Sequence, residues 1–116
     1  MTDWTAFELD ALLAEQRGSG EPWLEFFRVP SLHAGLYVLP RGGWDHQTPH
    51  EEDEFYHVVS GRATFEAGDR RQPARAGTLI FVPAHQPHRF TDIEEELHVL
   101  VFFSSLRADV APAPKS

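Results

Sequence analysis

The sequence predicts an all-β fold, either a sandwich or a barrel, preceded by one short helix. Short apolar segments alternate with turn residues about every 8–12 positions through most of the chain, the spacing typical of such folds. A length of 116 residues fits one domain. There is no cysteine, and no apolar run reaches the roughly 18 residues that a membrane helix requires.

The helix is predicted over residues 5–16. Apolar residues recur there at helical spacing, at Ala6, Leu9, Leu12 and Leu13. Thr5 and Glu8 have the spacing of a capping box, and Gly18-Ser19-Gly20 predicts the end of the helix. Because the apolar stripe is too short for a stable isolated helix, we expect it to pack on the β-structure or on a partner.

The strands follow from apolar runs and the turn residues between them. They are predicted over Trp23–Val29, Leu32–Leu39, 55–59, 63–67, Leu79–Val82 and 97–103. Gly68-Asp69 is typical of a hairpin turn, and Ser60-Gly61 predicts a break between two strands. The expected organisation is a helix and linker over residues 1–20, a β-domain over 21–107, and a disordered Pro/Ala-rich tail over 108–116.

The charge of the chain excludes several classes of function. The formal net charge is −8, from 18 acidic and 10 basic residues, so we expect no binding to nucleic acid or to an anionic membrane. The first ten residues lack the charged and apolar regions of a signal peptide. A cytoplasmic protein is therefore the expectation.

Two histidines and one carboxylate suggest a metal site. His50 and Glu54 are four residues apart just before a predicted strand, and His88 lies in a turn with several prolines. Imidazole and carboxylate ligands together suit Fe, Mn, Ni, Cu or Zn, and three ligands leave positions open for water or substrate. The chain has seven histidines, however, so the alternative is a solvated acidic loop with unrelated histidines.

The residues around these three resemble the two motifs of the cupin family. The first motif, G-x5-H-x-H-x3/4-E-x6-G, matches Gly42, His50, Glu54 and Gly61 in every spacing. The second, G-x5-P-x-G-x2-H-x3-N, matches Gly77, Pro83 and His88. The resemblance implies a double-stranded β-helix, the jelly-roll barrel, with a divalent metal held inside by His50, Glu54 and His88.

The chain departs from the motifs at three positions. Thr48 stands where the family has its first histidine, His85 replaces a glycine, and Asp92 replaces an asparagine. Because Thr48 is a poor ligand, His46 is a candidate fourth ligand and Gln47 a weaker one.

Other residues are candidates for roles around the metal. Glu52 is a candidate general base, although a solvated acid is the simpler interpretation. Arg62 and Arg89 are candidates to pair with a substrate carboxylate, although a surface position is the simpler interpretation for both. Aromatic residues are candidates for a pocket wall, and each also fits an ordinary core: Tyr37, Tyr56, Phe65, Phe81, Phe90 and Phe102.

The expected function is a metal-dependent enzyme of the dioxygenase, isomerase or lyase type that acts on a small organic molecule. The alternative is a non-catalytic small-molecule-binding or sensor protein, favoured by the missing histidine at Thr48. A purely structural metal is a third interpretation, weakened because structural zinc sites usually have four ligands. The resemblance also implies a homodimer, in which the strand Trp23–Val29 is the edge that a partner would protect.

Overall fold

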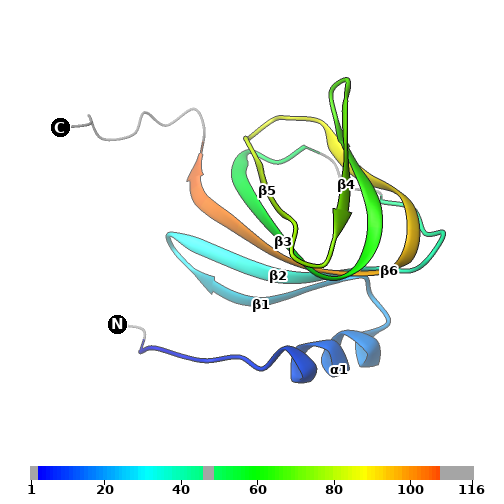
Figure 1. Cartoon of the computed structure of the whole chain (residues 1–116). Helices are drawn as coiled ribbons and strands as arrows, with labels where there is room; N and C mark the ends of the chain where they lie inside the picture. Colours follow the sequence, from blue (N-terminus) through cyan, green and yellow to red (C-terminus); the bar gives the residue numbers. More distant parts are fainter. Residues whose placement is uncertain (1–2, 46–48, 108–116) are drawn as a thin grey trace.

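The chain forms one helix and six strands around a barrel. The computed structural model describes residues 3–45 and 49–107. The elements are α1 (Leu9–Ser19), β1 (Trp23–Val29), β2 (Leu32–Leu39), β3 (Glu52–Ala67), β4 (Arg70–Arg75), β5 (Leu79–Val82) and β6 (His88–Arg107) (Figure 1). Within the described residues, no helix is both long enough and apolar enough to cross a membrane.

Two long curved strands organise the barrel. All pairings are antiparallel, in the order β1-β2-β6-β3-β4, and β5 pairs with the first half of β3 beside them. β3 and β6 pair along nearly their whole length and curl around the barrel (Figure 1). β4 and β5 both pair with β3 and not with each other, so they flank an opening in the wall. This is the predicted all-β fold, with β1 at the predicted edge.

The strands correct the prediction: β4 was not predicted at all, and β3 and β6 are both longer than expected. β3 is continuous across Gly61, where a break was predicted, because this glycine occupies a positive φ of 96° and lies too close to Glu96 for a side chain to fit. β6 likewise begins at His88 and runs through Glu94–Glu96, ahead of the strand predicted over 97–103. At both places the strands curve, and shifts in the β3–β6 register accommodate the extra residues.

The helix also begins later than predicted. It starts at Leu9, Glu8 occupies the N-cap position without a side-chain cap, and the capping box at Thr5 is therefore wrong. The preceding segment is extended and places Phe7 against Phe26, with ring centroids 4.9 Å apart. The helix ends as predicted, at Gly20 in the left-handed conformation.

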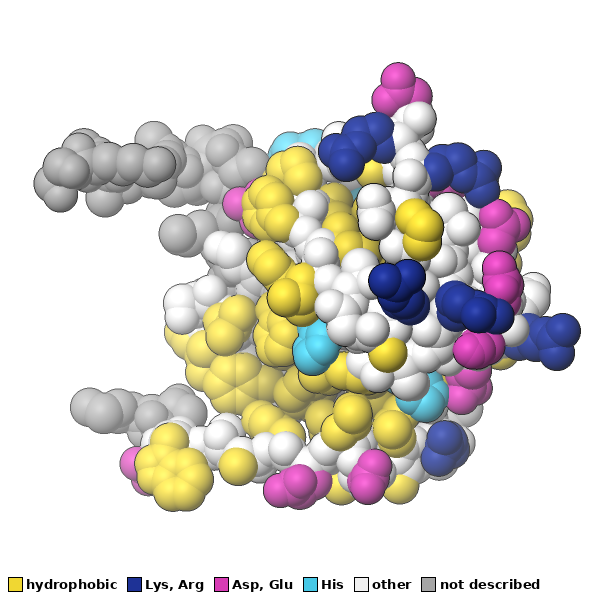
Figure 2. Space-filling model, viewed as in Figure 1, with side chains coloured by type: hydrophobic (Ala, Val, Ile, Leu, Met, Phe, Trp, Pro, Cys, Tyr) yellow, Lys and Arg dark blue, Asp and Glu magenta, His cyan; other side chains and the backbone are white. Residues whose placement is uncertain are grey.

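Two apolar clusters lie on opposite faces of the sheet. Alternate residues of β6, such as Leu97 and Val99, point inward and are fully buried with Tyr56 and Val58 of β3. Leu12 of α1 packs with Leu36, Val38 and neighbouring residues on the outer face of β2. Figure 2 shows apolar side chains gathered between the barrel and the N-terminal segment, and basic side chains over the region of β4.

Candidate metal centre

Glu54 and His88 meet inside the barrel although they lie at distant points of the sheet. Glu54 is near the start of β3, whereas His88 begins β6 and pairs with Ala67 at the other end of β3. The curl of β3 brings the two side chains together, and each is only 1% exposed. His88 Nε2 lies 2.8 Å from Glu54 Oε1. The predicted proximity of these two residues is what the structure shows.

The orientation of the His88 ring leaves one nitrogen lone pair directed into the barrel. Nδ1 lies 2.6 Å from the backbone carbonyl oxygen of Gln86, which can only accept a hydrogen bond. The neutral ring therefore carries its proton on Nδ1. Nε2 then accepts a hydrogen bond from the hydroxyl of Tyr56, at 2.9 Å. A backbone carbonyl that fixes the tautomer in this way is the usual support of a metal-binding histidine.

The carboxylate of Glu54 is buried without a hydrogen bond. Its Oε1 is within ion-pair distance of His88 Nε2, at 2.8 Å. Apart from this charge contact, neither oxygen of Glu54 has a hydrogen-bond partner among the described residues. An ionised carboxylate in this state is costly unless a positive charge neutralises it.

The pKa of His88 reflects this charge. Burial lowers the pKa, but the contact with Glu54, the bond to the Gln86 carbonyl and the negative charges of Glu54 and Asp45 outweigh it. The net effect raises the pKa of His88 above its ordinary value of 6.5. In the absence of another cation, protonation of His88 is the available way to offset the buried carboxylate.

His50 lies close to this pair without forming a three-ligand group with it. Its ring centroid is 6.4 Å from that of His88 and 4.9 Å from that of Phe103. Its carbonyl accepts a hydrogen bond of 2.7 Å from the backbone N–H of His85, which ties the two motif loops together. No three acidic or imidazole side chains within residues 3–45 and 49–107 are yet close enough to hold an ion.

The remaining candidate ligands lie elsewhere or outside the described residues. His46, Gln47 and Thr48 belong to the part of the chain that the structure does not describe. Glu52 is at the mouth of the barrel, where its Oε2 lies 3.7 Å from Nε2 of His33. His33 in turn stacks on Phe103, with centroids 4.6 Å apart.

The two arginines named from the sequence are already paired with acids. Arg89 donates to Glu66 at 2.9 Å and lies over the ring of Trp44, and Arg62 pairs with Glu94 at 3.0 Å. The predicted pairing of Arg62 or Arg89 with a substrate therefore has no support in the geometry.

Sequence reasoning missed one buried carboxylate near the site. Asp45 is 4% exposed, accepts a hydrogen bond from the hydroxyl of Tyr37 at 2.8 Å and another from the backbone N–H of Phe90 at 2.8 Å. Burial, together with the charge and hydrogen bond of Asp45, raises the pKa of Tyr37. Asp45 follows a Gly-Gly turn, where an acid is ordinarily solvated, so nothing local marked it as buried.

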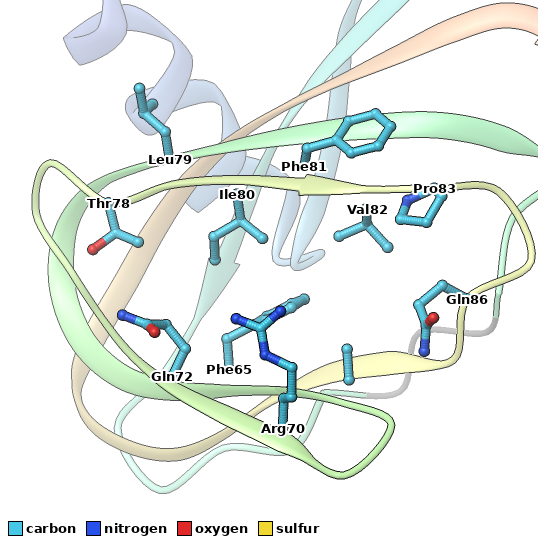
Figure 3. A pocket seen from close by; sticks show the side chains of 11 residues that line it. Phe65, Arg70, Gln72, Thr78, Leu79, Ile80, Phe81, Val82, Pro83 and Gln86 are labelled. Atoms are coloured by element: carbon cyan, nitrogen blue, oxygen red, sulfur yellow. The ribbon is translucent and has the colours of Figure 1, made fainter.

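Two cavities lie beside this centre. A cavity of about 310 Å³ is bordered by His88 together with Pro49, Glu66 and Arg89. A second, of about 440 Å³, lies between β4 and β5 (Figure 3). Phe65 lines the second cavity and lies with its ring centroid 5.9 Å from that of His88, so this ring forms a shared wall.

The comparison with known families agrees with this fold and with the two motifs. The cupin domain family matches residues 35–103, more than half of the chain. The chain belongs to the cupin family. A protein of Streptomyces coelicolor, itself uncharacterized, is 43% identical over 99 residues, which cover 85% of this chain and 94% of that protein.

Solved structures show the same fold at low sequence identity. A cupin 2 conserved barrel protein of Rhodopseudomonas palustris superposes with a TM-score of 0.64 and 18% identity, covering 83% of this cupin and 71% of that chain. The DMSP lyase DddQ of Ruegeria pomeroyi superposes with a TM-score of 0.62 and 22% identity, covering 79% of this cupin and 50% of that chain. A putative mannose-6-phosphate isomerase of Ralstonia eutropha superposes with a TM-score of 0.57 and 24% identity, covering 72% of this cupin and 83% of that chain. At these identities the likeness establishes the fold alone.

Proposed function

We propose that this cupin binds a divalent metal through His50, Glu54 and His88 and acts on a small organic molecule. The observation that carries the proposal is the buried carboxylate of Glu54, which has no hydrogen bond among the described residues and lies against the Nε2 face of His88. A cation at this point would remove the cost of the buried charge.

The chemistry of the donors fits Fe, Mn, Ni, Cu or Zn. Neutral imidazole and carboxylate ligands are shared by all five, so the donors do not choose among them. His50 would complete the set by moving its ring toward His88, and His46 remains a candidate fourth ligand. When bound, such an ion supplies Lewis-acid polarisation of a carbonyl or, if redox-active, activation of dioxygen.

The residues of the chain would perform the other tasks of the site. The Gln86 carbonyl holds the His88 ring in one orientation through its contact with Nδ1. The apolar rings of Phe65 and Phe90 exclude water around it. Glu52, half-buried at the mouth near His33, is the candidate general base. Three protein ligands with open positions favour chemistry of that kind over a purely structural ion, which usually has four ligands.

Metal binding is tested with alanine variants of the ligands. His50→Ala and His88→Ala should each weaken binding of Mn²⁺, Ni²⁺ or Zn²⁺ at least tenfold, measured by calorimetric titration of chelator-treated protein. His57→Ala is the matched control, because this histidine lies on the opposite face of β3 from Glu54 and should leave affinity unchanged. Protein that binds no divalent metal at micromolar concentration would contradict the proposal.

The alternative is a non-catalytic binding protein, favoured by Thr48 in place of the family's first histidine. The two functions differ in turnover. Metal-loaded protein that consumes dioxygen, or converts a carbonyl substrate, supports the enzyme. Saturable ligand binding without turnover under any of the five metals supports the alternative.

We also propose a homodimer. The exposed apolar residues Phe55, Leu79 and Phe81 lie on the outer face of β3 and β5, and β1 leaves one edge of the sheet unpaired. Light scattering after gel filtration should give twice the monomer mass, and Phe81→Asp should reduce it. A monomer at high micromolar concentration would contradict this.

A further inference from the structure

We infer that the cavity between β4 and β5 binds a small carboxylate with an apolar body, and that Arg70 recognises the carboxylate. The inference rests on the proposed function for its claim that this ligand is the substrate, but the binding itself does not require a metal. Its starting point is the only charged group among the residues that line the cavity, the guanidinium of Arg70.

The position of Arg70 follows from the alternation of β4. Arg70 pairs with Ala67, Gln72 with Phe65 and Ala74 with Ala63, so the even residues of β4 share the inward face of buried Phe65 and Ala63. Arg71 and Arg75 point the other way. Figure 3 shows the side chains of Arg70 and Gln72 directed across the cavity toward β5.

The opposite wall is apolar. Ile80 and Val82 of β5 point into the cavity, whereas Leu79 and Phe81 of the same strand point away from it (Figure 3). Val82 and Phe65 are buried, and Ile80 is half-buried against the core. With a volume of about 440 Å³, the cavity falls in the range that holds small organic ligands.

The charge of Arg70 is uncompensated, unlike that of the other arginines near the site. Arg71 pairs with Asp92 and Glu66, and Arg89 pairs with Glu66. Among the residues that the structure describes, Arg70 forms no ion pair and no acid lines its cavity. In a chain of net charge −8, a free guanidinium above an apolar floor selects an anion.

The surroundings favour a carboxylate over a phosphorylated sugar. One guanidinium, with the amides of Gln72 and Gln86, matches a singly charged carboxylate. The floor of Phe65, Ile80 and Val82 offers no partner for the hydroxyl groups of a sugar. It suits an aliphatic or aromatic body, and Phe65 separates that body from His88 by a single ring.

The test uses benzoate, hexanoate and 3-phenylpropionate, each with its neutral amide, and mannose 6-phosphate, titrated calorimetrically into chelator-treated protein. At least one carboxylate should bind about tenfold more tightly than its amide, the difference expected of a charge-assisted hydrogen bond. Arg70→Gln should remove that tenfold preference and leave amide affinity unchanged. Arg75→Gln is the matched control on the outer face of the same strand. It should change neither the preference for the carboxylate nor the affinity for the amide.

Three results would overturn the inference: no binding by any carboxylate, equal binding of acid and amide, or equal effects of Arg70→Gln and Arg75→Gln. Tighter binding of mannose 6-phosphate would overturn the choice of ligand class. Since the titration is done without metal, its outcome is independent of the His88→Ala test. Carboxylate binding without metal binding would refute the proposed function alone. Metal binding without carboxylate binding would refute this inference alone.

Discussion

Replacement of Glu54 by glutamine should stabilise the metal-free protein and remove its response to metal. Glu54→Gln keeps the shape of the side chain and deletes its charge. Both oxygens are buried without hydrogen bonds among the described residues, so the wild-type protein carries the desolvation cost of an uncompensated carboxylate whenever His88 is neutral. An unsatisfied buried polar group costs about 1–3 kcal/mol, and more when charged. The amide retains part of this cost, so we expect a gain of about 1–2 kcal/mol.

The size and sign of this gain depend on pH and on metal. The gain is largest toward high pH, where His88 loses the proton that offsets the charge, and at about pH 8.5 it corresponds to a rise of roughly 4–10 °C in Tm. Below about pH 6 the protonated His88 pairs with Glu54, so the gain should shrink or reverse. With metal at about 100 times Kd, the free energy of unfolding of the wild-type protein should rise by about 2.7 kcal/mol, whereas that of the variant should not change.

The assay is differential scanning calorimetry of both proteins, with chelator and with saturating Mn²⁺, at the two pH values. Glu95→Gln, an exposed acid on β6, is the control and should have little effect. A variant less stable than wild type in chelator at about pH 8.5 would show that the wild-type carboxylate is satisfied, and the reasoning from its isolation would then be refuted.

Three further predictions follow from single contacts. Gly61→Ala should destabilise the protein by at least about 2 kcal/mol in urea unfolding, because an added Cβ would meet the carbonyl of Glu96. Gly77→Ala is the control: this glycine also has a positive φ but lies in open space, so the substitution should cost about 1 kcal/mol. Tyr56→Phe should cost the metal-free protein about 1 kcal/mol, yet raise metal affinity about fivefold in calorimetric titration, because the hydroxyl competes for the His88 lone pair. Since the pKa of His88 is raised on folding, its stabilising contribution is complete below pH 6.5 and is lost as pH rises through the raised value. Urea unfolding of chelator-treated protein should therefore show a decline above pH 6.5 that His88→Gln lacks, and an equal decline in both would contradict this.

The sequence predicted strands well where local turn chemistry sets their ends. Trp23–Val29, Leu32–Leu39 and Leu79–Val82 have the predicted bounds, since prolines or glycines flank them. The prediction failed where a residue typical of turns lies instead inside a curved strand. Gly61 is at once a good turn signal and the residue that lets β3 pass close to β6, and only tertiary contact distinguishes the two roles. The helix start failed similarly, because packing of Phe7 on Phe26 outweighs a capping box.

The sequence predicted that Glu54 and His88 lie together but not the hydrogen bonds around them. Motif spacing indicated that His88 and Glu54 lie together, and they do. The tautomer of His88 depends on a carbonyl two residues away, and its lone pair faces a tyrosine 32 residues distant. Such partners follow from how the strands curl, which no local pattern records. His50 stays a predicted ligand, since its ring approaches the pair without joining it.

The arginines show why the available charge at a site is a property of the fold. The sequence nominated Arg62 and Arg89 because they lie near the motifs, yet both pair with glutamates. Arg70 and Arg71 are adjacent and indistinguishable by composition. The β4 register turns Arg71 outward to Asp92 and Glu66, and turns Arg70 inward over Phe65, where it forms no ion pair with the described residues. A one-residue shift in that register would exchange the two, and would leave the cavity with a neutralised wall. The selectivity that we assign to the cavity therefore depends on the Gly68-Asp69 turn, which fixes the pairing of Ala67 with Arg70.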